Sequence, residues 1–284
     1  MDNKYQLLSF NKDYLPIESF KLDINNRAFR YGDGFFETMH ANGFDIQFIE
    51  SHYKRIIKAS QILKIKLPDF FSLKFLKEQV SGLLNRKKLF QGARVKVSIY
   101  RDSEGLFIPK SNNSHLLIEA QYLSKGLYEL NTKGVSIGIY GEMAKPKSLF
   151  SSIKSLNAQP YILAGIFAKE NQYDDALILN DDGVIIEATS SNIFLVKGNN
   201  IITPPIDSGC VDGIMRKQVL SIAYRIEYSV TLQSIKPDDL TDADELFLTN
   251  AISGIRYISG YKEKRYFKRA SCKFMKELNN IAFG

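Results

Sequence analysis

The chain has 284 residues, of which 44% are hydrophobic, so it is long enough to fold as two compact domains or as one large one. No apolar run approaches the ~20 residues that cross a bilayer, and the first residues do not lead from a basic region into an apolar one, so we expect a cytoplasmic protein with no membrane partner. The net charge of +7 comes from 38 basic and 31 acidic residues spread along the chain, which is typical of solvated faces, and no recognition motif supports nucleic-acid binding.

The first part of the chain predicts a mixture of helices and strands. Its patterns predict a hairpin within 35–50, helices at 51–65 and 71–85, and strands at 93–102 and 114–123. The hairpin is expected at Asn42-Gly43, because this pair admits the positive φ angles of a tight turn, and Ser51 is the expected N-cap of the first helix. We therefore expect a smaller α+β domain over residues 1–123.

A polar, glycine-containing segment at 124–134 is the expected linker to a larger second domain over 135–284. In the second domain the patterns predict strands at 135–140, 175–180, 184–189 and 244–251, a hairpin within 191–205, and helices at 157–171, 213–227 and 265–282. The fold class expected from these elements is α+β in two domains.

Several familiar chemistries are excluded by inspection of the sequence. There is no G-x-G-x-x-G, P-loop or G-x-S-x-G pattern, and the three histidines lack the spacing of metal ligands. Cys210 and Cys272 lack the paired spacing of a zinc site and are expected to be reduced thiols, so we expect no metal. What remains is a lysine, several acids and places where a phosphate group fits.

Four residues stand out, and each also has an ordinary structural interpretation. Lys154 precedes an apolar helical stretch, where a lysine is commonly a solvated charge. Glu187 ends an apolar run, either as an edge-strand residue facing water or as a buried carboxylate that pairs with a heterocycle nitrogen. Gly213 opens a helix whose free N–H groups suit a phosphate, and Arg55 adds a guanidinium if it is not simply solvated.

Together, such a lysine, carboxylate and phosphate cradle are what pyridoxal 5'-phosphate requires. An unprotonated lysine amine condenses with the cofactor aldehyde. A carboxylate at the ring nitrogen keeps the pyridinium protonated, so that the ring accepts electrons when a bond at the substrate's α-carbon breaks.

At this point the sequence resembles the class IV aminotransferases, the fold-type IV pyridoxal-phosphate enzymes that include branched-chain and D-amino-acid aminotransferases and 4-amino-4-deoxychorismate lyase. The resemblance is carried by seven motifs in the family's order, at 26–43, 50–60, 93–105, 153–165, 182–196, 202–220 and 244–255. It implies a small N-terminal α+β domain, a larger C-terminal domain with a barrel-like sheet, the cofactor between them, a small-molecule substrate and a homodimer.

The resemblance also implies roles for individual residues. Lys154 resembles the Schiff-base lysine and general acid/base, and Glu187 the partner of the pyridine nitrogen. The other positions that match cofactor-binding residues are Asn192 near the ring, Arg55 at the phosphate, Ile214 and Met215 as backbone donors at the helix start, and Asn250 with Ala251 in a second phosphate loop. Tyr31 falls where the family has an aromatic residue facing the substrate.

Three departures from the family pattern bear on the reaction. Many transaminases of the family have a tyrosine four residues after the lysine, whereas this chain has Ala158. Met215 stands where threonine is usual, so only its backbone N–H is claimed. The substrate carboxylate is commonly met by an arginine on the strand at 93–102, where either Lys96 or Arg94 serves here.

The short sequences "KSLN", which begins at Lys154, and "TNA" at 249–251 lean towards the lyase branch of the family. The first hypothesis is therefore a 4-amino-4-deoxychorismate lyase that forms p-aminobenzoate and pyruvate. The alternative is an aminotransferase that moves the amino group of a small branched-chain or D-amino acid to a 2-oxo acid. A non-catalytic relative that only binds the cofactor is the third, and the presence of both Lys154 and Glu187 argues against it.

Overall fold

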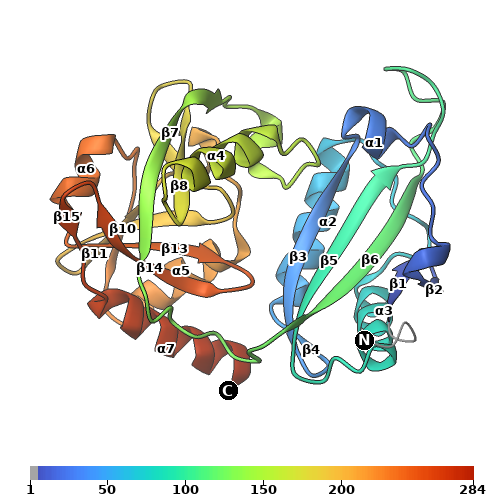
Figure 1. The fold of residues 1–284 in the computed structure, drawn as a ribbon. Helices are drawn as coiled ribbons and strands as arrows, with labels where there is room; N and C mark the ends of the chain where they lie inside the picture. Colours follow the sequence, from blue (N-terminus) through green and yellow to red (C-terminus); the bar gives the residue numbers. More distant parts are fainter. Residues whose placement is uncertain (1–5) are drawn as a thin grey trace. The chain divides into compact units, whose positions relative to one another are not determined.

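The computed structural model describes residues 6–284, which divide into two compact units (Figure 1). Unit 1 contains the described residues through Leu127 together with Ile153–Asn157, and unit 2 contains Tyr128–Ser152 and Ala158–Gly284. The segment that carries Lys154 was assigned by sequence to the second domain, whereas its contacts group it with unit 1. Within residues 6–284, no helix is both long and apolar enough to span a bilayer.

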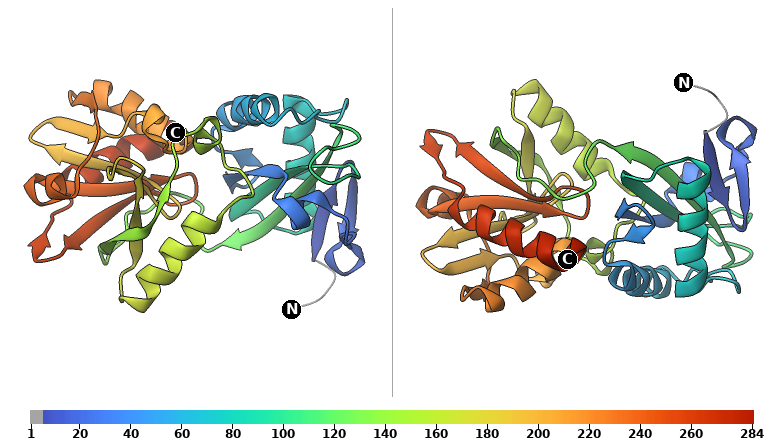
Figure 2. Two further views of the ribbon diagram at one scale, coloured as in Figure 1. Left: turned by 90° about the horizontal axis from the view of Figure 1, so that it is seen from above. Right: turned by 90° about the horizontal axis from the view of Figure 1, so that it is seen from below.

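Unit 1 is built on a six-stranded antiparallel sheet in the order β2-β1-β6-β5-β3-β4. Its elements are β1 (Leu7–Phe10), β2 (Asp13–Pro16), α1 (Arg27–Tyr31), β3 (Gly34–Asn42), β4 (Asp45–Ile46), α2 (Ile49–Ile62), α3 (Leu73–Arg86), β5 (Gly92–Arg101) and β6 (Ser114–Leu123). The helices α2 and α3 lie on the same side of this sheet (Figure 2).

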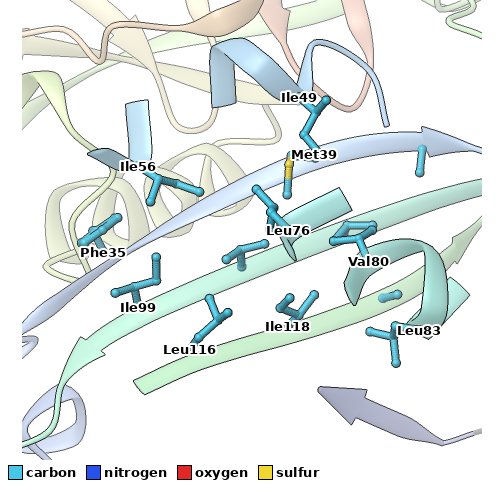
Figure 3. Close-up of a cluster of buried hydrophobic side chains, with 14 of the residues drawn as sticks. Phe35, Met39, Ile49, Ile56, Leu76, Val80, Leu83, Ile99, Leu116 and Ile118 are labelled. Atoms are coloured by element: carbon cyan, nitrogen blue, oxygen red, sulfur yellow. The ribbon is translucent and has the colours of Figure 1, made fainter. Parts of the chain in front are cut away.

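Strand alternation sets which side of the unit 1 sheet is buried. On β3, β5 and β6 every second residue points towards the helices, and these apolar side chains form one core with α2 and α3 (Figure 3). The fully buried members include Met39, Ile56, Leu76, Ile99 and Ile118. The opposite face of the central strands is therefore left to polar and charged side chains such as Lys96 on β5.

The sequence predicted most of unit 1, with both ends of one helix wrong. The hairpin at Asn42-Gly43, the helix predicted at 71–85 and both long strands are confirmed, and the structure shows Ser72 as the N-cap of that helix. The helix expected at 51–65 runs from Ile49 to Ile62, and its N-cap is Phe48 instead of Ser51, because Ile49 packs into the core as part of the first turn of α2. The elements β1, β2 and α1 were not predicted.

Unit 2 contains a nine-stranded mixed sheet in the order β12-β11-β10-β13-β14-β7-β8-β9, with β15 paired to β14. The strands are β7 (Val135–Lys145), β8 (Asp175–Asn180), β9 (Ile185–Ala188), β10 (Asn192–Lys197), β11 (Asn200–Thr203), β12 (Ser229–Leu232), β13 (Glu245–Asn250), β14 (Gly254–Tyr261) and β15 (Lys264–Arg265). The helices are α4 (Gln159–Glu170), α5 (Ile214–Arg225), α6 (Pro237–Asp242) and α7 (Arg269–Phe283). Only the pairs β11–β12, β14–β7 and β7–β8 are parallel.

Two differences from prediction in unit 2 have clear physical causes. The closing helix was expected from residue 265, but Lys264 and Arg265 pair with β14 as β15, so α7 begins at Arg269. Strand β7 was expected to end at residue 140. It continues to Lys145, because after an irregular stretch Lys145 pairs with Asn180 of β8. The core lies against this sheet, and α7 packs on β14 and α5.

Candidate active site

Lys154 is held in unit 1 by its main chain. The Phe36 N–H donates to the Lys154 carbonyl at 2.8 Å, and the Leu156 N–H donates to the Gly34 carbonyl at 3.0 Å. This short segment therefore extends the β3 edge of the sheet, and helix α4 begins only at Gln159. The lysine Nζ lies 4.7 Å from the centroid of the Phe36 ring. Lys154 is thus not the helix-end charge that its position in the sequence first indicated.

The candidate substrate residues lie on the polar face of the unit 1 sheet. Lys96 pairs with Thr38 across β5 and β3, and its Nζ lies 5.7 Å from the centroid of the same Phe36 ring. Arg94, two residues earlier, pairs with His40 and contacts Gln121 on β6 at 3.4 Å. Lys154 and Lys96 therefore both approach the ring of Phe36. Arg94 lies two residues further along β5 on the same face.

Tyr31 is the last residue of α1. Its ring centroid lies 5.7 Å from that of Phe107, and the Arg27 guanidinium carbon lies 5.0 Å from the Tyr31 ring centroid. Phe107 is 87% exposed, so Tyr31 contacts a loop that itself faces solvent. The substrate-facing role of Tyr31 stays a prediction.

Arg55 belongs to a buried cluster that the sequence did not predict. Its Nε donates to Glu37 Oε1 and its Nη2 to Glu37 Oε2, both at 2.7 Å, which is the two-pronged geometry that a guanidinium makes with a carboxylate. His52, one turn earlier on α2, contacts the same Oε2 through Nδ1 at 2.7 Å. The signal was present in the sequence, because Glu37 stands at a core-facing position of β3 and His52 precedes Arg55 by three residues.

The protonation of this cluster follows from burial and charge. Burial raises the pKa of Glu37, but the Arg55 charge and the hydrogen bonds from His52 and Arg55 outweigh it and lower that pKa to about 2. Burial lowers the pKa of His52; the hydrogen bond and charge of Glu37 oppose this shift, the positive charges of Arg55 and Lys154 add to it, and the net change is downward. The neutral His52 ring therefore donates from Nδ1 to an ionised Glu37.

These shifts predict an acid-labile unit 1. Because the pKa of Glu37 is lower in the folded protein, its contribution to stability is present above the ordinary value of 4.5 and is lost as the pH falls towards about 2. Glu37→Gln is expected to reduce the free energy of unfolding near neutral pH by on the order of 3 kcal/mol, and this difference from wild type should close at low pH. Denaturant titrations at several pH values measure it. Glu119→Gln, which changes a carboxylate 42% exposed on the same sheet, is the control, and a gap of equal size there would contradict the prediction.

Glu187 is a buried carboxylate, not an edge-strand residue facing water. It lies on β9 with 2% of its surface exposed, although β9 is the last strand of the sheet order. Oε1 accepts from Lys145 Nζ at 2.6 Å and from the Tyr161 hydroxyl at 2.8 Å, and Oε2 accepts from the Val211 N–H at 2.9 Å. Neither Lys145 nor Tyr161 was predicted as a site residue.

Two further groups near Glu187 are held neutral. Burial and the adjacent Glu187 carboxylate raise the pKa of Tyr161, so its hydroxyl remains a hydrogen-bond donor. Burial and the same carboxylate raise the pKa of the Cys210 thiol to about 12. Both cysteines are free, and Cys272 is exposed on α7.

Glu187 and Asn192, two predicted site residues on β9 and β10, hold the turn before α5 in place. Glu187 accepts from the Val211 N–H, and Asn192 Nδ2 donates to the Val211 carbonyl at 2.9 Å. Gly213 is the N-cap of α5, and no side chain caps this helix end. A Cβ on Gly213 would meet Asn192 Oδ1 at 1.9 Å, so glycine is required for the turn to pass this close. Asn192 therefore supports the helix start.

The second predicted phosphate loop lies next to this turn. The Asn250 Oδ1 accepts from the Ile252 N–H at 3.0 Å and the Ser253 N–H at 2.8 Å, and its Nδ2 donates to the Ser191 hydroxyl at 3.0 Å. Asn192 pairs with Thr249 across β10 and β13, so the loop before β10, the loop after β13 and the start of α5 converge. Ala251 accepts from the Tyr128 hydroxyl at 3.2 Å through its carbonyl.

The residues of unit 2 fit pyridoxal phosphate by the chemistry of their donors. The first turn of α5, with Ile214 and Met215, offers backbone N–H groups without a side-chain cap, as a phosphate requires. The Thr249 hydroxyl beside it is buried and has no hydrogen-bond partner within residues 6–284. Glu187 supplies the carboxylate that a pyridinium nitrogen requires.

Comparison with known proteins gives the family. The family model for amino-transferase class IV matches residues 34–261. The chain therefore belongs to the class IV aminotransferase family, and it is an enzyme. It is 28% identical over 244 residues to an aminodeoxychorismate lyase of Vibrio harveyi, covering 84% of this chain and 86% of that protein. It is 26% identical over 250 residues to a putative branched-chain-amino-acid aminotransferase of Methanocaldococcus jannaschii, covering 86% and 84%.

Solved structures confirm the α+β fold class and its fold-type IV architecture. A putative 4-amino-4-deoxychorismate lyase of Legionella pneumophila has a TM-score of 0.82 at 26% identity, covering 93% of this chain and 97% of that one. A branched-chain amino acid aminotransferase solved with pyridoxamine 5'-phosphate has a TM-score of 0.86 at 22% identity, covering 99% and 95%, and it shows likeness of fold. The family's members thus include both lyases and aminotransferases, as the sequence predicted.

Proposed function

We propose that this enzyme uses pyridoxal 5'-phosphate, with Lys154 as the lysine that bonds to the cofactor and Glu187 as the partner of its ring nitrogen. The buried Glu187, the uncapped start of α5 and the unpartnered Thr249 hydroxyl support this proposal. Arg55 and the loop of Asn250 are assigned to the phosphate by their match to the family motifs. The cytoplasmic location and the homodimer are part of the same proposal, by family resemblance.

The substrate we propose is 4-amino-4-deoxychorismate. The observation that carries this choice is the face of unit 1 on which Lys154 and Lys96 approach one aromatic ring, at 4.7 and 5.7 Å from the centroid of Phe36, with Arg94 beyond them. A cyclic substrate with two carboxylates matches this aromatic side chain together with the cations Lys96 and Arg94 on the same face. The similarity to the lyase of Vibrio harveyi and the absence of a tyrosine at Ala158 also support a lyase.

In this proposal each residue has a defined task. The chemistry that pyridoxal phosphate supplies when bound is an aldehyde for the substrate amine and a ring that accepts electrons. Lys154 Nζ removes the proton from the carbon that bears the amine. The C–O bond to the enolpyruvyl group then breaks, its electron pair leaves with that group, and a proton converts the group to pyruvate while the ring becomes aromatic. Lys96 or Arg94 binds the carboxylates, and Glu187 holds a proton at the ring nitrogen.

The second candidate is an aminotransferase, favoured by the similarity to the Methanocaldococcus jannaschii protein. It shares every step up to proton removal. Lys154 would then return the proton to the cofactor carbon, and a 2-oxo acid would later receive the amino group. The residues near the start of α4 argue against this alternative. Many transaminases of the family have a tyrosine at the position of Ala158, and the Tyr161 hydroxyl does not replace it, because it donates to Glu187.

A spectral assay separates the candidates. The cofactor-loaded protein is first reduced with borohydride, which should attach the cofactor permanently to Lys154. Peptide mapping then identifies the labelled residue. Single amino acids and 4-amino-4-deoxychorismate are then added separately to unreduced protein. The lyase is supported by release of p-aminobenzoate and pyruvate without conversion of the cofactor by amino acids. Conversion to the pyridoxamine form supports the aminotransferase, and an unlabelled Lys154 would end both enzyme proposals.

A further inference from the structure

A second lysine of unit 2 is buried against Glu187. Lys145 is the last residue of β7 and is 7% exposed, although the four residues before it are exposed. Its Nζ donates to Glu187 Oε1 at 2.6 Å and to the Ser151 carbonyl at 3.0 Å, and it lies 5.2 Å from the centroid of the Tyr161 ring. Burying an ammonium group is costly unless it is paired, so these contacts indicate a specific role.

The hydrogen bonds to Glu187 are divided unequally between its two oxygens. An ionised carboxylate has about four acceptor positions, two on each oxygen. Lys145 and Tyr161 take both positions of Oε1, and the Val211 N–H takes one position of Oε2. Within unit 2 as described, the remaining position for a further N–H donor is on Oε2. Lys145 therefore helps to determine which oxygen of Glu187 meets a ligand.

Lys145 also determines the charge around Glu187. Of the groups hydrogen-bonded to Glu187 in the described part of unit 2, Tyr161 is neutral and Val211 contributes a peptide N–H, so Lys145 is the charged one. The remaining ionisable groups of that neighbourhood have other partners. Cys210 is a neutral thiol, Arg216 donates to the Pro204 carbonyl at 2.9 Å, and Asp212 pairs with Lys217 at 2.8 Å.

We propose that Lys145 is the positioning residue of Glu187: it holds Oε1, directs Oε2 to the pyridine nitrogen, and by its charge makes that nitrogen lose its proton at a lower pH than Glu187 alone would allow. This inference rests on the proposed use of pyridoxal phosphate. A positive charge within about 6 Å of a protonated nitrogen opposes its proton, with an effect of about one pH unit or more on the titration midpoint. Lys145 thereby limits how strongly the site stabilises a protonated ring.

The test uses holoenzyme loaded with pyridoxal phosphate carrying ¹⁵N in the ring, whose chemical shift reports the proton on that nitrogen. Lys145→Met removes the charge and the donor, and Lys145→Gln removes the charge but keeps an N–H donor. Both variants are expected to raise the titration midpoint of the ring nitrogen by about one pH unit or more. Lys145→Arg keeps the positive charge and should have the wild-type midpoint. Since the readout is the cofactor's own spectrum, it does not depend on which reaction the enzyme catalyses.

A matched control lies two residues further along the chain. Lys147 is 40% exposed and pairs with Asp182, so Lys147→Met removes a surface lysine and should leave the midpoint unchanged. If Lys145→Met does not fold, Lys145→Gln alone decides. A wild-type midpoint in Lys145→Gln, with Lys154 still labelled by borohydride, would overturn the role of Lys145 and leave the proposed function intact. Failure of wild type to bind the cofactor through Lys154 would instead overturn the proposed function.

Discussion

For the proposed lyase, replacing Lys154 by alanine is expected to lower turnover of 4-amino-4-deoxychorismate by at least about 10³-fold. Alanine has neither an amine to bond to the cofactor nor a base to remove the substrate proton. The fold of unit 1 should persist, because the segment is held through the Lys154 carbonyl and the Leu156 N–H, not through the lysine side chain. Stopped-flow and steady-state assays of p-aminobenzoate release measure the loss, and thermal unfolding checks the fold.

Two further variants make the Lys154 result specific. Lys154→Arg keeps a cation beside Phe36 but has no free amine at neutral pH, so its turnover should be as low as that of Lys154→Ala. Lys74→Ala removes an 84% exposed lysine from α3 of the same unit and should leave turnover at the wild-type value. If Lys154→Ala kept turnover within about tenfold of wild type, Lys154 would not be the catalytic base.

The main elements of both units could be predicted because their signals are local. Helical spacing gave α2, α3 and α5, and alternation gave β5 and β6 to within one residue. Glu187 could be singled out in the same way, because a carboxylate interrupts an apolar strand pattern. Its burial is confirmed, whereas its pairing with a heterocycle nitrogen stays a prediction.

The partners of the site residues could not be predicted, because they come from distant parts of the chain. In the sequence, Lys145 is one lysine of a polar "KPK" stretch. Its burial depends on the pairing of Lys145 with Asn180 of β8, and no periodic pattern in the sequence predicts this pairing. Glu37 meets Arg55 across 18 residues for a similar reason. The grouping of Lys154 with unit 1 depends on the β-bridge between Phe35 and Ser155, and no local sequence pattern predicts this bridge.

Glu187→Gln is expected to lower turnover by about 10²-fold or more, while Lys154 still bonds to the cofactor. A neutral amide cannot stabilise a proton on the ring nitrogen as a carboxylate does, so the ring accepts electrons from the substrate less strongly. The variant should also be less stable by about 3 kcal/mol, because Lys145 then stays buried with no opposite charge on its partner. Turnover, borohydride labelling and denaturant unfolding are the three measurements.

The double variant Lys145→Met/Glu187→Gln separates catalysis from stability. It removes both buried charges, and replacing a whole buried pair is commonly neutral, so the free energy of unfolding should return towards wild type. Turnover should remain far below wild type, because the carboxylate is still absent and removal of the Lys145 charge restores only part of the proton affinity of the ring nitrogen. Asp182→Asn breaks the exposed pair with Lys147 and should change neither quantity. If the double variant regained wild-type turnover, the effect of Glu187→Gln would come from misfolding around Lys145, and the role of Glu187 at the ring nitrogen would be wrong.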